Sequence, residues 1–156
     1  MALPESTQPD ASQARALDLW HIRFGWTVIA VFAGLGMLLE TMHGLKLGWY
    51  LDVDSTTRRF LFTLGHAHGV LIGFVNVFFG LTLRTGSVER ERLASRCLVA
   101  ANVLMPTGFL LGGIDTHGGD PGLATLALVP LGGSLLLIGV VSIALGTRDP
   151  GPRSRP

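Results

Sequence analysis

Charge and cysteine are both scarce in this chain of 156 residues. Only 15% of the residues are charged and the formal net charge is +1. A nearly neutral chain without a basic stripe is not typical of a nucleic-acid-binding protein, so we expect no nucleic-acid partner. The single cysteine, Cys97, excludes an intrachain disulfide. The absence of a Cys-x-x-Cys-His motif excludes covalent attachment of a c-type haem.

Apolar sequence, in contrast, is abundant. Four apolar segments cover Ile22 to Met42, Phe60 to Leu83, Leu93 to Ile114 and Gly122 to Leu145. Each has the roughly 20 residues that an α-helix needs to cross a bilayer. At this length and number, helices are the form that satisfies the backbone in lipid. The sequence therefore predicts an all-α integral membrane protein, a four-helix bundle in contact with the lipid bilayer.

Polar stretches flank the four segments. Residues 1–16 are polar, and they lack the basic start and apolar core of a secretory signal. We therefore expect them to form a disordered tail. Residues 17–147 would form the transmembrane domain, and residues 148–156 a Pro/Arg-rich tail. Nine basic residues fall on the side of the two termini, and three fall on the other side. The nine are Arg15, Arg23, Arg84, Arg90, Arg92, Arg96, Arg148, Arg153 and Arg155; the three are Lys46, Arg58 and Arg59. The positive-inside rule therefore predicts cytoplasmic termini, in the inner (plasma) membrane of a bacterium.

Four of the five histidines gather at the opposite, outward side. Glu40 and His43 lie at the end of the first segment, and His66 and His68 lie in the outer half of the second. An ionisable side chain within a membrane is costly unless it is paired or ligating, so it marks a candidate functional site. We therefore predict a metal or cofactor site facing the periplasm. The candidate metal ligands are His43, His66, His68, His117, Glu40 and Asp115.

The spacing of these residues limits how they could share a metal. Glu40 and His43 are three apart, so they lie on one helix face, as in the Glu-x-x-His pairs of di-iron bundles. His66 and His68 are about 200° apart around a helix, so they cannot easily bind one metal. A two-histidine, one-carboxylate set drawn from Glu40, His43, His66 and His117 would suit ferrous iron. The alternative is that the histidines only hydrogen-bond to neighbouring helices.

The stretch from Gly65 to Gly73, with His66-Ala67-His68 in it, resembles the haem-bearing helix of the haem–copper oxygen and nitric oxide reductases. In that family a His-x-His pair on one transmembrane helix serves two haems. The resemblance implies that His66 would bind a high-spin haem and His68 a low-spin haem. The adjacent His-His pair and the His-Pro-Glu motif of that family's copper site do not occur in this chain.

Other polar or small residues in the apolar segments have simpler interpretations. Gly65, Gly69 and Gly73 form a stripe that lets another helix or a flat ligand approach. Asn76 is expected to hydrogen-bond to another helix, and Pro106 to kink the third segment. His21 lies between Trp20 and Arg23, so we interpret it as part of an interfacial belt.

These observations favour a membrane redox protein that binds haem b or a non-haem transition metal, iron or copper, at His43, His66 and His68. Such a protein would transfer electrons or react with oxygen or another small gas, and it could be a haem- or metal-dependent oxidoreductase. The alternatives are a membrane protein that handles copper, iron or zinc, and an accessory subunit of a respiratory complex. Its partners would be a redox protein or that larger complex, and assembly into a homo-oligomer is left open.

Overall fold

The computed structural model describes residues 11–51, 56–116 and 119–148. Its four helices are α1 (Ala11–Gly44), α2 (Thr56–Thr85), α3 (Glu91–Ile114) and α4 (Leu123–Gly146). All four are long and apolar enough to cross a membrane, which confirms the predicted all-α class and the number of helices. Residues 11–16, assigned from the sequence to the N-terminal tail, belong to α1. Residues 1–10 and 149–156 lie outside the described residues.

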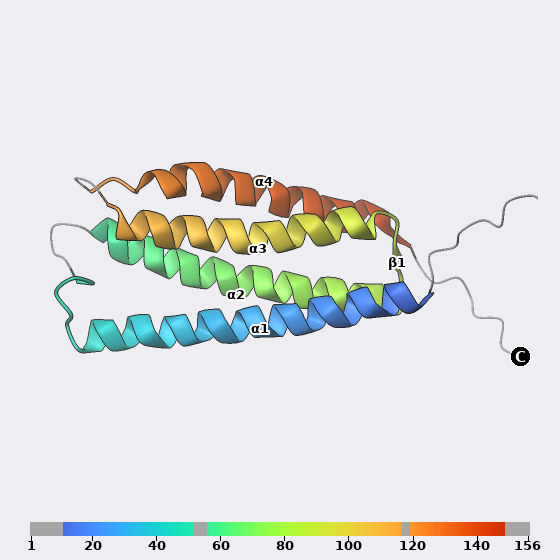
Figure 1. The fold of residues 1–156 in the computed structure, drawn as a ribbon, viewed down its shortest axis with the longest axis horizontal. Helices are drawn as coiled ribbons and strands as arrows, with labels where there is room; N and C mark the ends of the chain where they lie inside the picture. The colour runs from blue at the N-terminus through green and yellow to red at the C-terminus, as the bar shows by residue number, and fades with distance from the viewer. Residues whose placement is uncertain (1–10, 52–55, 117–118, 149–156) are drawn as a thin grey trace, which may run out of the picture.

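The four helices run antiparallel, each packed mainly on its neighbours in sequence. α1 and α4 lie at the two outer sides of the arrangement, with α2 and α3 between them (Figure 1). We call the end where α1 finishes and α2 begins the loop end. The opposite end, where α1 begins and α4 finishes, is the terminal end. α3 continues through Pro106 as an α-helix.

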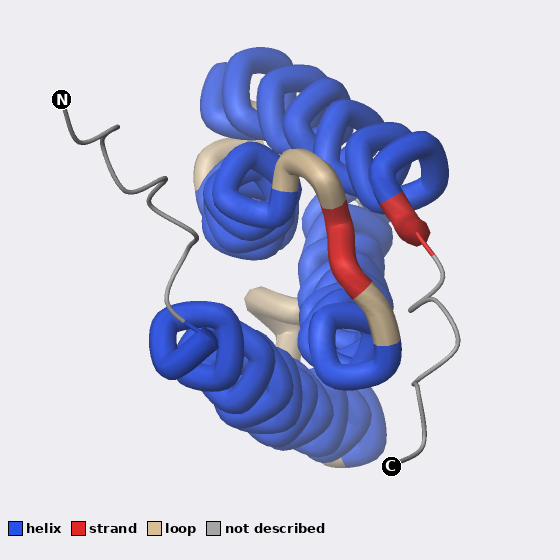
Figure 2. Tube along the Cα trace, turned by 90° about the vertical axis from the view of Figure 1, so that its right-hand side faces the viewer, coloured by secondary structure: helices blue, strands red, loops and turns tan. Residues whose placement is uncertain are grey.

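Two short strands join the helices at the terminal end. β1 (Ser87–Val88) pairs antiparallel with β2 (Thr147–Arg148), so that Val88 lies opposite Thr147. The pair links the α2–α3 connection to the end of α4 (Figure 2). The N–H of Glu89 extends the ladder by donating to the carbonyl of Gly146 at 2.9 Å.

The glycine stripe of α2 is mainly a packing surface for α1. A Cβ on Gly69 would overlap the ring of Phe32, and a Cβ on Gly73 would lie 2.8 Å from Ile29 Cγ1. On the facing helix, a Cβ on Gly25 would lie 2.6 Å from the carbonyl oxygen of Gly73. Glycine therefore brings the two backbones together here, which confirms the predicted close approach of a helix.

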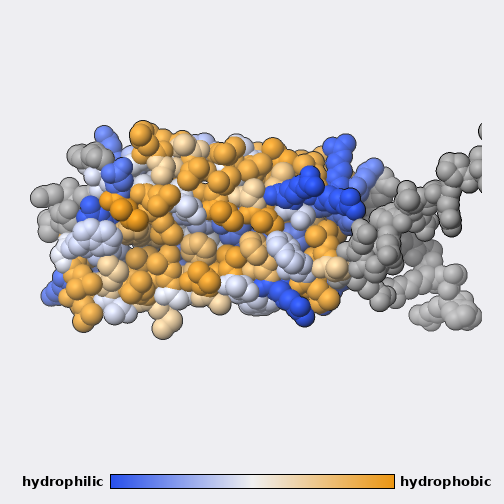
Figure 3. All heavy atoms as spheres, viewed as in Figure 1, coloured by the Kyte–Doolittle hydropathy of each residue, from blue (hydrophilic) through white to orange (hydrophobic). Residues whose placement is uncertain are grey.

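The fourth helix packs through glycine in the same way. Its buried residues are Gly132, Gly139 and Gly146, spaced by seven, and they lie against α3 and the residues that precede it. The large side chains of α4 point outward instead; Leu126 is 62% exposed and Leu145 is 83% exposed. Hydrophobic residues cover most of the face seen in Figure 3, and hydrophilic residues gather near its two ends. This distribution is what lipid contact requires.

Candidate functional site

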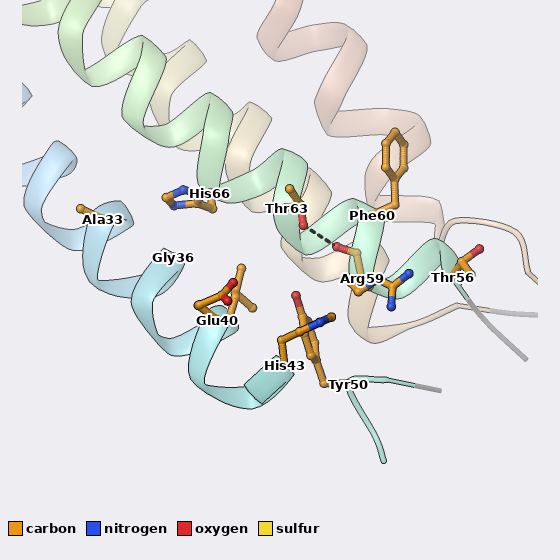
Figure 4. A pocket seen from close by; sticks show the side chains of 11 residues that line it. Ala33, Gly36, Glu40, His43, Tyr50, Thr56, Arg59, Phe60, Thr63 and His66 are labelled. Carbon is orange, nitrogen blue, oxygen red and sulfur yellow. Dashed lines mark hydrogen bonds between the residues drawn. The ribbon is translucent and has the colours of Figure 1, made fainter. Parts of the chain in front are cut away.

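A groove of about 710 Å³ opens between α1 and α2 at the loop end. Its apolar wall includes Ala33, Leu39 and Phe60. Its polar side chains come from both helices and from the connection between them (Figure 4). These are Glu40, His43, Tyr50, Thr56, Arg59, Thr63 and His66. Three of the six candidate ligands predicted from the sequence thus lie on one groove: Glu40, His43 and His66.

His66 is the candidate ligand held most firmly. Its Nδ1 lies 2.6 Å from the carbonyl oxygen of Phe32 on α1. A carbonyl only accepts, so Nδ1 carries the proton and Nε2 presents a lone pair. The ring fits because residue 36 is glycine: a Cβ there would lie 2.7 Å from Nδ1 and 2.9 Å from Nε2. Together, Phe32 and Gly36 fix the tautomer and the position of the ring.

Glu40 and His43 lie one turn apart at the end of α1, and both are exposed. The helix ends just beyond them because Lys46 takes a left-handed conformation, with φ 54°. The Lys46 N–H donates to the carbonyl of His43 at 3.1 Å, and the Leu47 N–H donates to that of Met42 at 3.1 Å. This pair of bonds is a Schellman cap, with lysine where glycine is usual. The cap turns the chain away, which leaves His43 at the groove.

Arg58 and Arg59, at the start of α2, make different contacts. Arg58 holds the loops of this end together: its Nη1 donates to the carbonyl of Trp49 at 2.9 Å, and its Nε donates to that of Gly113 at 3.2 Å. Its guanidinium also lies 5.0 Å from the centre of the Trp49 ring. Arg59 instead lines the groove, where it adds a positive charge beside Glu40 and His43.

His68 faces away from this groove. Its Nδ1–H donates to the carbonyl of Leu64 one turn earlier, at 2.8 Å, and its ring centre lies 4.9 Å from that of Phe109 on α3. His66 packs on α1 while His68 packs toward α3. The prediction that the pair cannot share one metal on a regular helix agrees with this geometry.

Asp115, the remaining candidate ligand that the structure describes, does not line the groove. Asp115 is exposed in the connection between α3 and α4, and His117 lies outside the described residues. Within the described ranges, no three His, Cys, Asp or Glu side chains come close enough to hold a metal ion. Three of the candidate ligands therefore line one groove, but they do not form a set of three that could hold a metal ion. The groove is lined by the fixed imidazole of His66, with the exposed Glu40 and His43 as neighbours.

The sequence did not predict a second polar cluster, which is formed by His21, Asn76, Ser95 and Asn102. His21 is fully buried between helices, so its interpretation as an interfacial residue is wrong. Its Nδ1 lies 2.9 Å from Oδ1 of Asn76 and its Nε2 lies 2.8 Å from Oγ of Ser95. Asn76 also donates to Oδ1 of Asn102 at 3.2 Å. The expected interhelical bonding of Asn76 is thus confirmed. One signal was present in the sequence: Asn76 and Asn102 interrupt two apolar segments, and His21 lies directly before a third.

One further ion pair lies beside this cluster at the terminal end. Nε of Arg84 donates to Oδ2 of Asp18 at 3.0 Å and joins α2 to α1.

No protein family, curated protein or solved structure matches this chain.

Proposed function

We propose that this chain is a membrane redox protein that binds one haem in the groove, with Nε2 of His66 as an axial ligand. The observation that carries the proposal is the bond from Nδ1–H of His66 to the carbonyl of Phe32 at 2.6 Å. Metal-ligating histidines almost always donate their second ring N–H in this way, which raises the basicity of the ligating nitrogen. Nε2 of His66 is left with its lone pair, and the His66 side chain lines the groove.

A haem suits the groove better than a metal ion held by protein groups alone. The porphyrin supplies the equatorial ligands, so the protein supplies only the axial ones. One oriented imidazole is then sufficient, and the described residues assemble no three-ligand set. The volume of about 710 Å³ lies in the range of small-molecule sites, roughly 300–1,000 Å³. Leu39 and Phe60 offer apolar contact, and Arg59 can pair with a cofactor carboxylate.

The second axial position would decide the chemistry. A bound haem supplies one-electron chemistry. With His43 as the second ligand the centre would carry electrons, whereas an open position would admit oxygen or another small gas. Glu40 lies one turn before His43, so it would orient an imidazole or hold a proton rather than bind the iron.

Non-haem iron or copper is the second candidate, and one feature of the groove supports it. Glu40, His43 and His66 line the same groove, and two imidazoles with one carboxylate suit ferrous iron. Glu40 and His43 are both exposed, so their side chains are free to rotate toward Nε2 of His66.

The basic residues support an outward-facing site. In the sequence, nine of them fall on the side of the two termini and three on the other side, so the positive-inside rule favours cytoplasmic termini. The groove would then open to the periplasm of a bacterium, on the side where an external redox partner could reach it.

Absorption spectra and metal analysis of the purified protein test the proposal. Protein from haem-competent, metal-replete cells should carry about one iron per chain and a Soret band that shifts on reduction. Glu40→Gln should weaken binding by roughly 10–100-fold without abolishing it. Stoichiometric metal without a Soret band would identify the non-haem candidate instead. Protein with neither haem nor metal would contradict both.

A further inference from the structure

The buried polar chain formed by Ser95, His21, Asn76 and Asn102 ends in an unused donor. His21 and Asn76 are fully buried, and Asn102 is 4% exposed. This hydrogen-bonded series joins α1, α2 and α3 through three bonds of 2.8–3.2 Å. Nδ2 of Asn102 has no partner among the described residues. A buried donor without a partner is costly, and native structures rarely keep one.

One backbone contact fixes which group donates and which accepts in each of these hydrogen bonds. Nδ2 of Asn76 lies 2.9 Å from the carbonyl oxygen of Ile72, which can only accept. This contact orients the amide, so Oδ1 of Asn76 faces His21 and must receive the proton on Nδ1. The second hydrogen on Nδ2 of Asn76 then goes to Asn102, whose Oδ1 must be the atom that accepts it. If N and O of Asn102 were exchanged, its NH₂ group would face the NH₂ group of Asn76, and neither could accept. The unpaired atom of Asn102 is therefore the donor Nδ2.

A backbone acceptor on the same residue has also lost its usual donor. In a helix the carbonyl of Asn102 would accept from the N–H of residue 106. Residue 106 is a buried proline inside α3, and proline has no N–H. Asn102 therefore presents an unpaired donor on its side chain and a carbonyl without its i+4 donor, both in the interior of the bundle.

We propose that Asn102 holds one buried water molecule between α2 and α3. Water is the fitting ligand because it accepts from Nδ2 and donates to a carbonyl, and it carries no charge. A charged acceptor would lose its hydration, and the hydrogen-bonded series of Ser95, His21, Asn76 and Asn102 contains no Lys or Arg to compensate it. The neighbouring Ile72, Leu98 and Met105 are buried and apolar, which limits the site to a small occupant.

This water completes a directed series of donors. The hydroxyl of Ser95 donates to His21, His21 donates to Asn76, Asn76 donates to Asn102, and Asn102 donates to the water. Each bond polarises the next, so the terminal N–H is a stronger donor than an isolated amide. Ser95 is partly exposed, and it connects the series to the surface at the terminal end. The site is separate from the groove at the loop end.

The composition of the chain gives a direct test. Asn76 and Asn102 are the only asparagines in the sequence, so ¹⁵N-asparagine labelling produces two side-chain NH₂ signals. Carbonyl-¹³C alanine identifies the backbone amide of Asn102, because Ala101 precedes it whereas Val75 precedes Asn76, and cross-relaxation from that amide then assigns the Asn102 side-chain NH₂. Asn76 is the matched control, since both of its N–H groups are donated to protein acceptors.

We expect cross-relaxation with water at the Asn102 NH₂ to be several-fold stronger than at the Asn76 NH₂ in the detergent-solubilised chain. Equal signals, or no water signal at Asn102, would overturn the proposal. Pro106→Ala should weaken the Asn102 signal, because alanine restores the helical donor. The control Pro130→Ala, at an exposed position of α4, should leave it unchanged. An unchanged signal in Pro106→Ala would refute the role of the carbonyl.

Discussion

Replacing His21 with leucine should destabilise the fold, although His21 is far from the proposed cofactor. Leucine fills a similar space but removes both hydrogen bonds of the ring. Ser95 is partly exposed and can turn to water, whereas Oδ1 of the fully buried Asn76 loses its only donor. An unpaired buried acceptor costs about 1–3 kcal/mol. Losing the edge-to-face contact with Phe79, at 4.7 Å, adds about 0.5–1.5 kcal/mol.

We therefore expect His21→Leu to lower the free energy of unfolding by about 2 kcal/mol or more. Unfolding in mixed micelles, followed by tryptophan fluorescence, measures this difference. The exposed His43 provides the control, since His43→Leu should change stability by less than about 0.5 kcal/mol. The double variant His21→Leu/Asn76→Leu should lose less than the sum of the single changes, because it removes donor and acceptor together. Additive losses, or a neutral His21→Leu, would refute the reasoning.

Three other outcomes follow from the packing and from the positions of basic residues. Gly69→Leu should destabilise the protein because the new side chain overlaps the Phe32 ring, whereas Gly34→Ala, which meets nothing within 4 Å, should be neutral or stabilising in a thermal melt. In a Cys97→Ala background, a membrane-impermeant thiol reagent should label Gly48→Cys and not Thr85→Cys; the opposite result would reverse the predicted sides. His68→Phe should retain the cofactor in a pigment assay, because that ring packs toward α3 and not on the groove.

The sequence predicts the helices and one of their contacts well. Four apolar runs of sufficient length must form helices in lipid, whatever their neighbours are. The four-residue spacing of Gly65, Gly69 and Gly73 predicted a close approach, and Gly69 and Gly73 indeed lie against α1. The angle of 100° per residue correctly predicted that His66 and His68 point to different sides of α2.

The depth and pairing of single side chains were harder to predict. His21 lies near the edge of an apolar run, but α1 begins ten residues earlier, at Ala11, so His21 lies well inside the helix. Its burial depends on α3, which supplies Ser95, and local sequence carries no information about that contact. Likewise, the sequence grouped Asp115 with the other candidate ligands at the outward side, but helix order separates it from the groove between α1 and α2.

The measurement that tests the central claim most directly is haem content, with reduced and oxidised absorption spectra, in His66→Ala and its matched control His68→Ala. The account predicts about one haem per chain in the wild type and loss of the bound haem in His66→Ala, a variant that lacks the ligating imidazole. His68→Ala should keep its Soret band, and both variants should retain the helical circular dichroism of the wild type. Loss of haem in His68→Ala with full retention in His66→Ala would contradict the account, as would a wild-type protein with no haem.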